Sequence, residues 1–221
     1  MQNRLPRILI FDFDGVIADS IPLKAEAFRE TFSFVPGHQD EIVRYHLDNG
    51  GMSRYVKFQN IYRDILHQPL TREQEEALAS RYQEQILQAM YSIPLIPGAE
   101  ALLGRYAAVI PLYVVSATPE EEMHIIAERR GLAGFFVRIY GSPRSKADCI
   151  REILSLEDIH PEDVLFIGDA PQDWQAARET GVRFIARVAE GDINRFEELP
   201  GVEMIVSDLH ELGDYLASPR K

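Results

Sequence analysis

The chain is poor in cysteine and has no long hydrophobic run. Cys149 is its only cysteine, which excludes an intramolecular disulfide and a cysteine-based zinc site and fits a reducing, cytosolic setting. Arg4 and Arg7 precede an apolar stretch that meets Asp12 after a few residues, too soon for the core of a signal peptide. No segment approaches the length of a membrane span. We therefore expect a cytoplasmic protein with no membrane partner.

Positive charge is also scarce, with 23 Lys and Arg residues against 35 Asp and Glu residues and a formal net charge of −12. Because nucleic-acid backbones bind to basic surfaces, this balance argues against a nucleic acid as the main partner. The 221 residues, 46% of them hydrophobic, can bury the core of one domain or of a domain with a smaller insertion. The composition leaves the oligomeric state open.

The apolar run that begins at Ile8 ends abruptly in two acids, Asp12 and Asp14, followed by Gly15. Side chains alternate along a strand, so these two carboxylates are expected on the same side, with Phe13 opposite. Two carboxylates about 5 Å apart repel by roughly 3 kcal/mol at an effective dielectric of 20, which the fold must offset with a cation or a proton. A solvated loop after a buried strand is the alternative interpretation, and the two acids alone do not decide between them.

The next part of the chain has the spacing of helices. Residues 22–32 have a helical period, and residues 40–90 contain no convincing strand. Thr71 and Gln74 form a capping-box pattern at the start of a long helix. We therefore predict an all-helical insertion, a cap, over residues 21–93, with a connector at residues 94–98.

The remaining sequence alternates apolar runs of strand length with helical segments. Strands are predicted at residues 109–115, 164–167, 184–186 and 204–206, each separated from the next by a helical segment, and a further strand at residues 136–140. One helix is predicted to begin with Thr118 as its N-cap, Pro119 at the first position and Glu121 completing a capping box. Such alternation predicts an α/β fold, a Rossmann-like parallel sheet with helices on both faces, formed by residues 1–20 and 94–221.

Polar residues follow several of the predicted strands, where ligands bind in parallel sheets. They are Asp12 and Asp14, then Ser116, then Asp169 with Asp173, while Lys146 opens a helix. Asp oxygens suit Mg²⁺, and Ser116 and Lys146 are complementary anion-binding groups. Each also has a structural alternative: Asp173 as a helix cap, Ser116 as the end of a strand, and Lys146 as a solvated helix residue.

These segments, taken in order, resemble the motifs of the haloacid dehalogenase superfamily, in its phosphatase branch with a helical cap after the first strand, the branch of phosphoglycolate phosphatases and beta-phosphoglucomutase-like proteins. The first motif is Phe11-Asp12-Phe13-Asp14-Gly15-Val16 with Asp19 and Ser20. The others are Val114-Val115-Ser116, then Lys146, then Gly168-Asp169 with Asp173. Four motifs in the right order make the resemblance specific, and it covers nearly the whole chain.

The resemblance implies an Mg²⁺-dependent phosphatase that acts on a small phosphorylated metabolite through an aspartyl-phosphate. Asp12 would be the nucleophile and Asp14 the general acid and base. Mg²⁺ would be held by Asp12, the carbonyl of Asp14 and Asp169, with Asp173 as a further or outer ligand. Ser116 and Lys146 would hold the phosphoryl oxygens.

Two residues of the predicted cap are candidates for substrate specificity. Arg54 follows the tight turn of Gly50 and Gly51 and resembles a cap arginine of sugar-phosphate mutases and related phosphatases, so we expect it to contact the substrate, with a second anionic group as the candidate partner. The alternative for Arg54 is a surface salt bridge or a charge at a helix start. Lys24 stands where phosphoglucomutase-like members have a histidine, which lowers the mutase interpretation; it is expected to form a salt bridge near the hinge or to help bind substrate.

Three functions follow from these observations: the phosphatase, a sugar-phosphate isomerase, and a binding or regulatory protein with incidental activity. Dehalogenation is disfavoured because it needs neither Asp14 nor a metal. The acidic run of Glu120, Glu121 and Glu122 is interpreted as favourable charge at a helix start, and the six histidines as structural or surface residues. Cys149 is interpreted as small core filler.

Overall fold

Six apolar segments form one parallel sheet in the computed structural model, which describes residues 5–218. The strand order is β3-β2-β1-β4-β5-β6, and each neighbouring pair is parallel. The strands at the centre are apolar almost throughout because helices cover both faces of the sheet. The strands are β1 (Ile8–Phe11), β2 (Leu112–Pro119), β3 (Arg138–Ser142), β4 (Val164–Gly168), β5 (Arg183–Arg187) and β6 (Val202–Val206).

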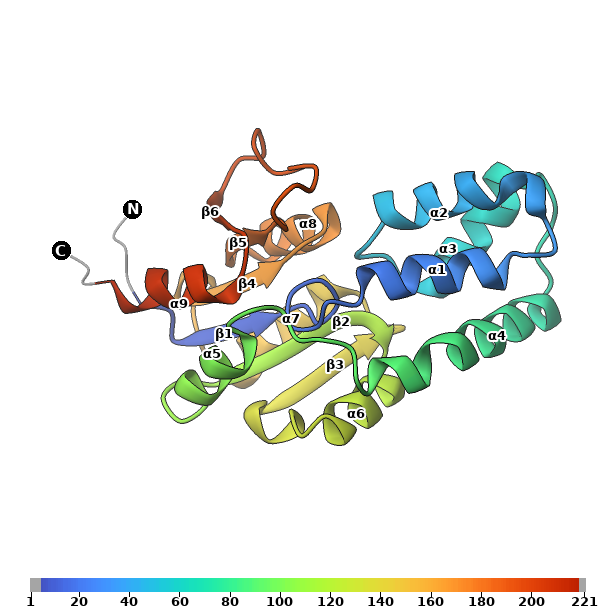
Figure 1. The fold of residues 1–221 in the computed structure, drawn as a ribbon. Coiled ribbons are helices and arrows are strands. Elements are labelled where there is room, and N and C mark those ends of the chain that lie inside the picture. The colour runs from blue at the N-terminus through green and yellow to red at the C-terminus, as the bar shows by residue number, and fades with distance from the viewer. Residues whose placement is uncertain (1–4, 219–221) are drawn as a thin grey trace.

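The alternation of side chains along β1 divides the core into two layers. Leu9 and Phe11 pack in one cluster with the apolar residues of α5, α6 and α9, whereas Ile8 and Ile10 pack in a second cluster with those of α7 and α8. The predicted α/β architecture with helices on both faces is therefore confirmed (Figure 1). These helices are α5 (Ala99–Tyr106), α6 (Glu120–Arg129), α7 (Lys146–Leu156), α8 (Pro171–Thr180) and α9 (Leu209–Ala217), with short turns η3 (Ala133–Phe135) and η4 (Pro161–Asp163).

The predicted helical cap is inserted between β1 and β2, and Figure 1 shows its helices gathered beyond the end of the sheet toward which the strand arrows point. Aromatic side chains fill its core, with Phe28 stacked on His46 and edge-on to Tyr82. The capping box of Thr71 and Gln74 is confirmed. The cap comprises α1 (Ile21–Thr31), η1 (Pro36–His38), α2 (Gln39–Asp48), α3 (Arg54–Asn60), the π-helical turn η2 (Ile61–Ile65) and α4 (Arg72–Met90).

The chain leaves the sheet and returns to it side by side. The amide of Asp19 donates to the carbonyl of Pro94 at 2.9 Å, and the amide of Ile96 donates to the carbonyl of Ile17 at 2.9 Å. The two segments that join cap and core are thus hydrogen-bonded to each other at the predicted connector, residues 94–98. The exact division at residues 21 and 93 stays a prediction. No helix within residues 5–218 is long and apolar enough to cross a membrane.

The expectation for β2 and the helix after it was wrong in two respects. Val109, predicted inside the strand, is 71% exposed in the turn after α5, and the strand begins at Leu112 and continues through Thr118 to Pro119. Helix α6 begins at Glu120 without a side-chain cap. The reason is tertiary: pairing with β3 extends the strand, and the Thr118 hydroxyl bonds to side chains of the candidate site instead of a helix amide.

The expectation that every pair of consecutive strands is separated by a helix was also wrong. Residues 188–201, between β5 and β6, contain no helix. Adjacent parallel strands need a long crossover connection, and here an irregular one suffices. The connection reaches the cap instead, because the Arg195 guanidinium lies 2.6 Å from a carboxylate oxygen of Asp48 in α2.

Candidate active site

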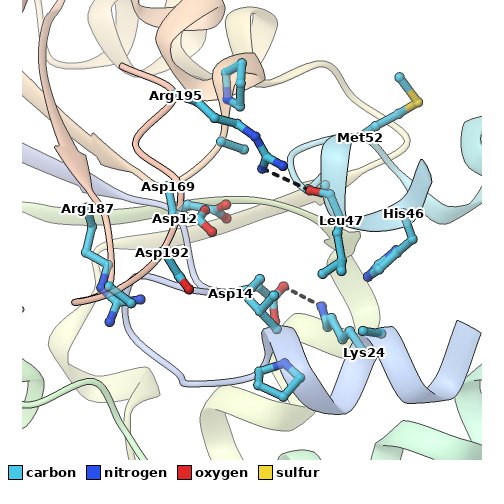
Figure 2. A pocket seen from close by; sticks show the side chains of 18 of the residues that line it. Asp12, Asp14, Lys24, His46, Leu47, Met52, Asp169, Arg187, Asp192 and Arg195 are labelled. Atoms are coloured by element: carbon cyan, nitrogen blue, oxygen red, sulfur yellow. Dashed lines mark hydrogen bonds and ion pairs between the residues drawn. The ribbon is translucent and has the colours of Figure 1, made fainter. Parts of the chain in front are cut away.

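The carboxyl ends of β1, β2 and β4 open onto a cavity of about 580 Å³ between core and cap. Phe11 is in register with Val114 and with Ile167, so the residues that follow these three positions emerge at one edge of the sheet. Figure 2 shows Asp12, Asp14 and Asp169 on the core side and Lys24, His46 and Leu47 on the cap side. The predicted convergence of strand-end acids is thus present in the structure.

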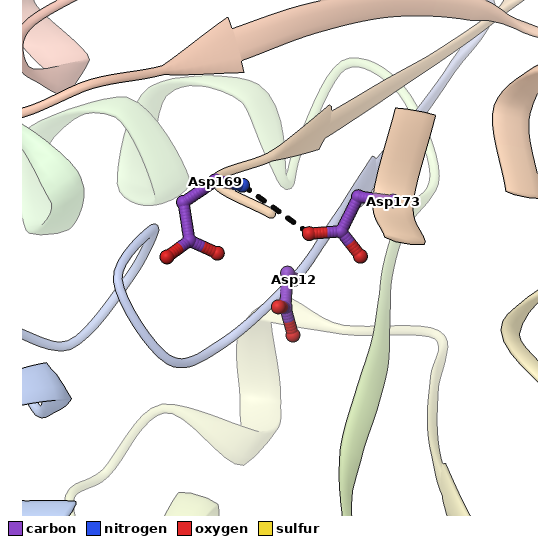
Figure 3. Close-up of side chains that lie close together, drawn as sticks. All are labelled: Asp12, Asp169 and Asp173. Atoms are coloured by element: carbon purple, nitrogen blue, oxygen red, sulfur yellow. Dashed lines mark hydrogen bonds between the residues drawn. The ribbon is translucent and has the colours of Figure 1, made fainter. Parts of the chain in front are cut away.

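Three of the predicted residues form an acidic cluster at the floor of this cavity. Asp12, Asp169 and Asp173 each offer a carboxylate oxygen, and these oxygens lie within 4.8 Å of one another (Figure 3). Asp12 follows β1, Asp169 follows β4, and Asp173 lies in the first turn of α8. Closely spaced carboxylate oxygens are the donors that hard divalent cations prefer, so this donor set fits a metal ion.

Electrostatics show why the acidic cluster needs positive charge. Burial raises the pKa of Asp12 to about 7, with further contributions from Asp173 and Asp14, and only Lys146 acts in the opposite direction. Burial and the negative charge of Asp12 likewise hold the pKa of Asp169 well above its usual value. Because one lysine faces the buried carboxylates of Asp12 and Asp173, with the partly buried Asp169 beside them, a bound cation would relieve the remaining repulsion.

Lys146 lies at the centre of this cluster. Its Nζ is 2.8 Å from Oδ2 of Asp12 and 2.5 Å from Oδ1 of Asp173. Burial lowers the pKa of Lys146, but the two carboxylates outweigh burial and raise it above its usual value. The ammonium is therefore charged, and the alternative of a solvated helix residue is wrong because only 8% of Lys146 is exposed.

Asp173 caps a helix, as the structural alternative for its sequence position expected, while its role as a metal ligand stays a prediction. Its Oδ2 accepts the backbone amides of Asp169 and Ala170 at 3.2 and 3.1 Å, which caps the start of α8. Its Oδ1 accepts from Lys146. Asp173 therefore orients both the loop that carries Asp169 and the lysine that faces Asp12.

Asp14 belongs to a second group of contacts at the junction of core and cap. Its Oδ1 accepts from the Ser20 hydroxyl at 2.6 Å, and its Oδ2 accepts from Thr118 Oγ1 at 2.9 Å. The Nζ of Lys24 lies 2.5 Å from Oδ2 of Asp14, which makes Lys24 a salt-bridge residue near the hinge, one of its two predicted roles. Burial favours a raised pKa for Asp14, but Lys24 and the two hydroxyls outweigh burial, so its pKa is lowered and it is a carboxylate here.

Ser116 and Lys146 lie just beneath the surface of the cavity. Ser116 is 2% exposed, and its Oγ accepts the backbone amide of Thr118 at 3.1 Å, which leaves the hydroxyl hydrogen for another acceptor. Neither residue is among those that line the cavity in the described part of the chain. The structure therefore places Lys146 against Asp12 and Asp173, while contact of Ser116 with a phosphoryl group stays a prediction.

Gly15 determines how closely the turn after Asp14 approaches Asp169. Its φ of +76° is in the left-handed region, and a Cβ added there would lie 2.2 Å from Oδ2 of Asp169. A substitution would therefore strain the backbone and displace a carboxylate of the acidic cluster.

We accordingly expect Gly15→Ala to lower kcat/KM by about 100-fold, because misplacing a reacting group by about 1 Å costs that much. Steady-state kinetics measures the loss, and unfolding by urea shows whether the variant still folds. Gly134→Ala, at a position with no atom within 4 Å of the added Cβ, is the matched control. If Gly15→Ala is as active as the control, the close approach of Gly15 to Asp169 is not needed for activity.

Arg54 is buried, not on the surface as its alternative interpretation expected. Its Nη1 and Nη2 donate to Oε1 and Oε2 of Glu122 at 3.0 and 2.5 Å, and its guanidinium lies over the ring of Tyr82 at 4.6 Å. The acidic run opens α6 as expected, but Glu122 is also 7% exposed and pairs with Arg54, a contact that charge at a helix start does not explain. The fold brings α6 against α3, and the pair links core to cap. Contact of Arg54 with substrate stays a prediction.

Arg54→Ala should raise KM and lower stability, since it leaves the Glu122 carboxylate buried and unpaired at a cost of about 3–5 kcal/mol. Comparison with Glu122→Gln separates two roles. If Arg54 also contacts substrate, Glu122→Gln should impair KM less than Arg54→Ala does. If the pair only links cap and core, both variants should raise KM equally. Steady-state kinetics with thermal unfolding of each variant makes the comparison, and unchanged KM in Arg54→Ala contradicts both roles.

The sequence interpretation missed several residues of the cavity. Thr118 was assigned to a helix cap, and His46, which lines the cavity and is 5% exposed, was grouped with structural histidines. Lys57 was not singled out, although it lines the cavity and is 2% exposed. One signal was available: the chain has only four lysines, Lys24, Lys57, Lys146 and Lys221.

Comparison with known proteins agrees with the geometry. A model of the haloacid dehalogenase-like hydrolase family matches residues 9–187. Phosphoglycolate phosphatase 1 of Pseudomonas aeruginosa is 29% identical over 192 residues, which cover 83% of this chain and 70% of that protein. The matched residues include all the acids of the candidate site.

Solved structures share the fold. A haloacid dehalogenase-like hydrolase from Streptococcus pneumoniae superposes with a TM-score of 0.75 at 25% identity, covering 95% of this chain and 98% of that one. CbbY from Rhodobacter sphaeroides, solved in complex with xylulose-(1,5)bisphosphate, superposes with a TM-score of 0.74 at 22% identity, covering 94% and 96%.

Proposed function

The chain belongs to the haloacid dehalogenase-like hydrolase family, and we propose that it is an Mg²⁺-dependent phosphatase that hydrolyses a small phosphorylated metabolite through an aspartyl-phosphate on Asp12. The observation that carries this proposal is the buried cluster of Asp12, Asp169 and Asp173 around Lys146, at the floor of a cavity enclosed by a cap. The names of its phosphoglycolate phosphatase relatives support the same reaction class.

The mechanism begins with Asp12. Its carboxylate oxygen attacks the phosphorus, the bond to the leaving oxygen breaks, and the phosphoryl group becomes covalently bound to Asp12. Lys146, 2.8 Å from Asp12, holds this carboxylate in place and balances negative charge on the phosphoryl oxygens, and the Ser116 hydroxyl donates to one of them. Asp12, the carbonyl of Asp14 and Asp169, with Asp173 in support, would hold Mg²⁺, which would supply further positive charge.

Asp14 acts as the general acid and base. As a carboxylate paired with Lys24, it can accept a proton from the water that hydrolyses the aspartyl-phosphate. Its role in protonating the leaving oxygen requires the pair with Lys24 to open, since that contact lowers the pKa of Asp14. The position of Lys24 at the hinge couples this proton transfer to the cap, which excludes water from the first step.

The first substrates to test are those that the relatives' names suggest: phosphoglycolate and sugar phosphates. Phosphate release is measured with and without Mg²⁺ across a set of phosphorylated metabolites that includes both anomers of glucose 1-phosphate. We expect release that EDTA abolishes. Isomer formation without phosphate release would support the mutase instead, and no metal-dependent reaction at all would defeat the proposal and favour a binding or regulatory protein.

A further inference from the structure

Lys57 is a cation buried in the cap wall of the cavity. It is 2% exposed, and its Nζ lies 3.1 Å from Nδ1 of His46 and 3.3 Å from the carbonyl oxygen of the same residue. The face of the Phe28 ring lies 5.6 Å from Nζ. Within residues 5–218, no carboxylate oxygen forms a salt bridge with Lys57. A buried ammonium of this kind lacks the counter-charge that such groups normally have.

The other cavity cations differ from Lys57 in this respect. Arg54, which the sequence suggested as the anion-binding residue, already holds Glu122 with both of its terminal nitrogens. Arg187 is bonded to main-chain carbonyls. The remaining cations that line the cavity each face an acid: Lys24 with Asp14, and Arg195 with Asp48.

His46 is a neutral hydrogen-bond acceptor for Lys57. Burial holds the pKa of His46 well below its usual value, and the charges of Lys57 and Lys24 lower it further, so the ring is neutral. Because its Nδ1 accepts from Lys57, the ring hydrogen is on Nε2. Burial also lowers the pKa of Lys57 to about 7, and an anion bound nearby would raise it again.

The distribution of lysine supports a function for this residue. Of the four lysines in the chain, the three that the structure describes are all buried, at 8%, 2% and 8% exposure for Lys24, Lys57 and Lys146. Two of them pair with the predicted catalytic carboxylates Asp12 and Asp14. Lysine is normally a surface residue, so Lys57, which lines the cavity and has no salt bridge to an acid within residues 5–218, is unexplained by packing alone.

We propose that Lys57, supported by His46, binds a second anionic group of the substrate, so that the substrate is a phosphate monoester that also carries a carboxylate or a second phosphoryl group. This inference rests on the proposed function, in which the first phosphoryl group lies at Asp12. Lys57 and Asp12 line the same cavity, and Asp14 and Asp169 of that cavity are close enough to Lys57 to raise its pKa, against the larger effect of burial. The anion completes the charge balance of Lys57, and its absence from a substrate leaves the ammonium unpaired.

The test compares substrates that differ only in the second anion. For the carboxylate, 2-phosphoglycolate is compared with 2-hydroxyethyl phosphate; for the phosphoryl group, ribulose 1,5-bisphosphate is compared with ribulose 5-phosphate. In at least one pair, the wild-type protein should have a higher kcat/KM for the substrate with the second anion than for the substrate without it. Lys57→Met should reduce this ratio of kcat/KM values by about tenfold or more. The ratio cancels any general loss of activity. Arg63→Gln, which removes an exposed cap charge, should keep the wild-type ratio.

Two further measurements keep the outcomes distinct. Lys57→Met should unfold at the wild-type temperature or above it, because an apolar side chain of similar length replaces a buried cation, so a loss of preference is not a loss of fold. Calorimetric binding of 2-phosphoglycolate, 2-hydroxyethyl phosphate and the two ribulose phosphates to Asp12→Asn, with and without Lys57→Met, tests the site without turnover.

If Lys57→Met keeps the wild-type ratio of kcat/KM values, Lys57 does not bind the second anion. Phosphate release by the wild-type protein would still support the proposed function in that case. If no substrate releases phosphate, the proposed function fails, and calorimetry alone decides the site. The proposal is supported if Asp12→Asn binds the substrate with the second anion more tightly than the one without it, and if Lys57→Met abolishes this difference. Equal binding of the two substrates of each pair to Asp12→Asn overturns the proposal.

Discussion

Asp12→Asn is expected to lower kcat by at least about 1,000-fold, because an amide oxygen cannot replace a carboxylate as the attacking nucleophile. The Asn side chain has nearly the same shape and can still accept from Lys146, so KM and the fold should change little. Phosphate release with the best substrate measures the loss. Asp40→Asn, which alters an exposed acid of the cap, is the control and should keep wild-type activity. Retention of more than about a tenth of wild-type kcat would remove Asp12 from the mechanism.

The same variant should change how stability depends on pH. The pKa of Asp12 is raised from 3.8 to about 7 on folding, so the folded protein without metal binds more protons than the unfolded chain between these values. The contribution of Asp12 to stability therefore falls as pH rises from about 4 to about 7 and stays low above that range. Asp12→Asn should reduce this fall, which urea unfolding in EDTA at several pH values measures. If the free energy of unfolding falls equally with pH in both proteins, Asp12 does not ionise with a raised pKa in the folded protein.

Lys146→Met is expected to be strongly destabilising, by about 3–5 kcal/mol without metal, because it leaves buried carboxylates with no cation. The free energy of unfolding should fall accordingly, and Tm by roughly 10 °C for a protein of this size. Mg²⁺ should restore part of this stability, since a bound cation replaces some of the lost positive charge. Activity should remain low in either case, because Lys146 also holds Asp12.

The measurement is urea unfolding of Lys146→Met with Mg²⁺ and with EDTA. Arg151→Met, on the exposed side of the same helix, is the matched control and should change the free energy of unfolding by less than about 1 kcal/mol in either condition. Lys146→Met as stable as this control in EDTA would show that the acidic cluster does not depend on the lysine.

Patterns of short range were enough to predict the strands and the acids at their ends. The run before Asp12 and the run before Asp169 are apolar throughout, as strands buried on both faces must be, and the residues after such strands meet at one edge. Asp12, Asp169 and Asp173 could therefore be grouped before any coordinates. Thr118 shows the limit: its capping pattern was present, but pairing with β3 and the contact with Asp14 determined its structure.

The contacts between cap and core could not be predicted in the same way. Arg54 and Glu122 are far apart in sequence, and nothing local distinguishes Glu122 from its two acidic neighbours. Burial decides their roles, because a charge removed from water must find a partner, and which partner it finds depends on how two helices pack. Lys57 is the converse case, a buried cation whose partner among the described residues is a neutral histidine.

By itself, the sequence determined the α/β architecture, the helical insertion and the identity of the acids, since hydrophobic period and strand-end position are properties of neighbouring residues. Only the tertiary structure decided which charges are neutralised within the chain. It pairs Lys24, Lys146 and Arg54 with acids and leaves Lys57 without one in the part of the chain that the structure describes, because that outcome depends on distances between segments remote in sequence.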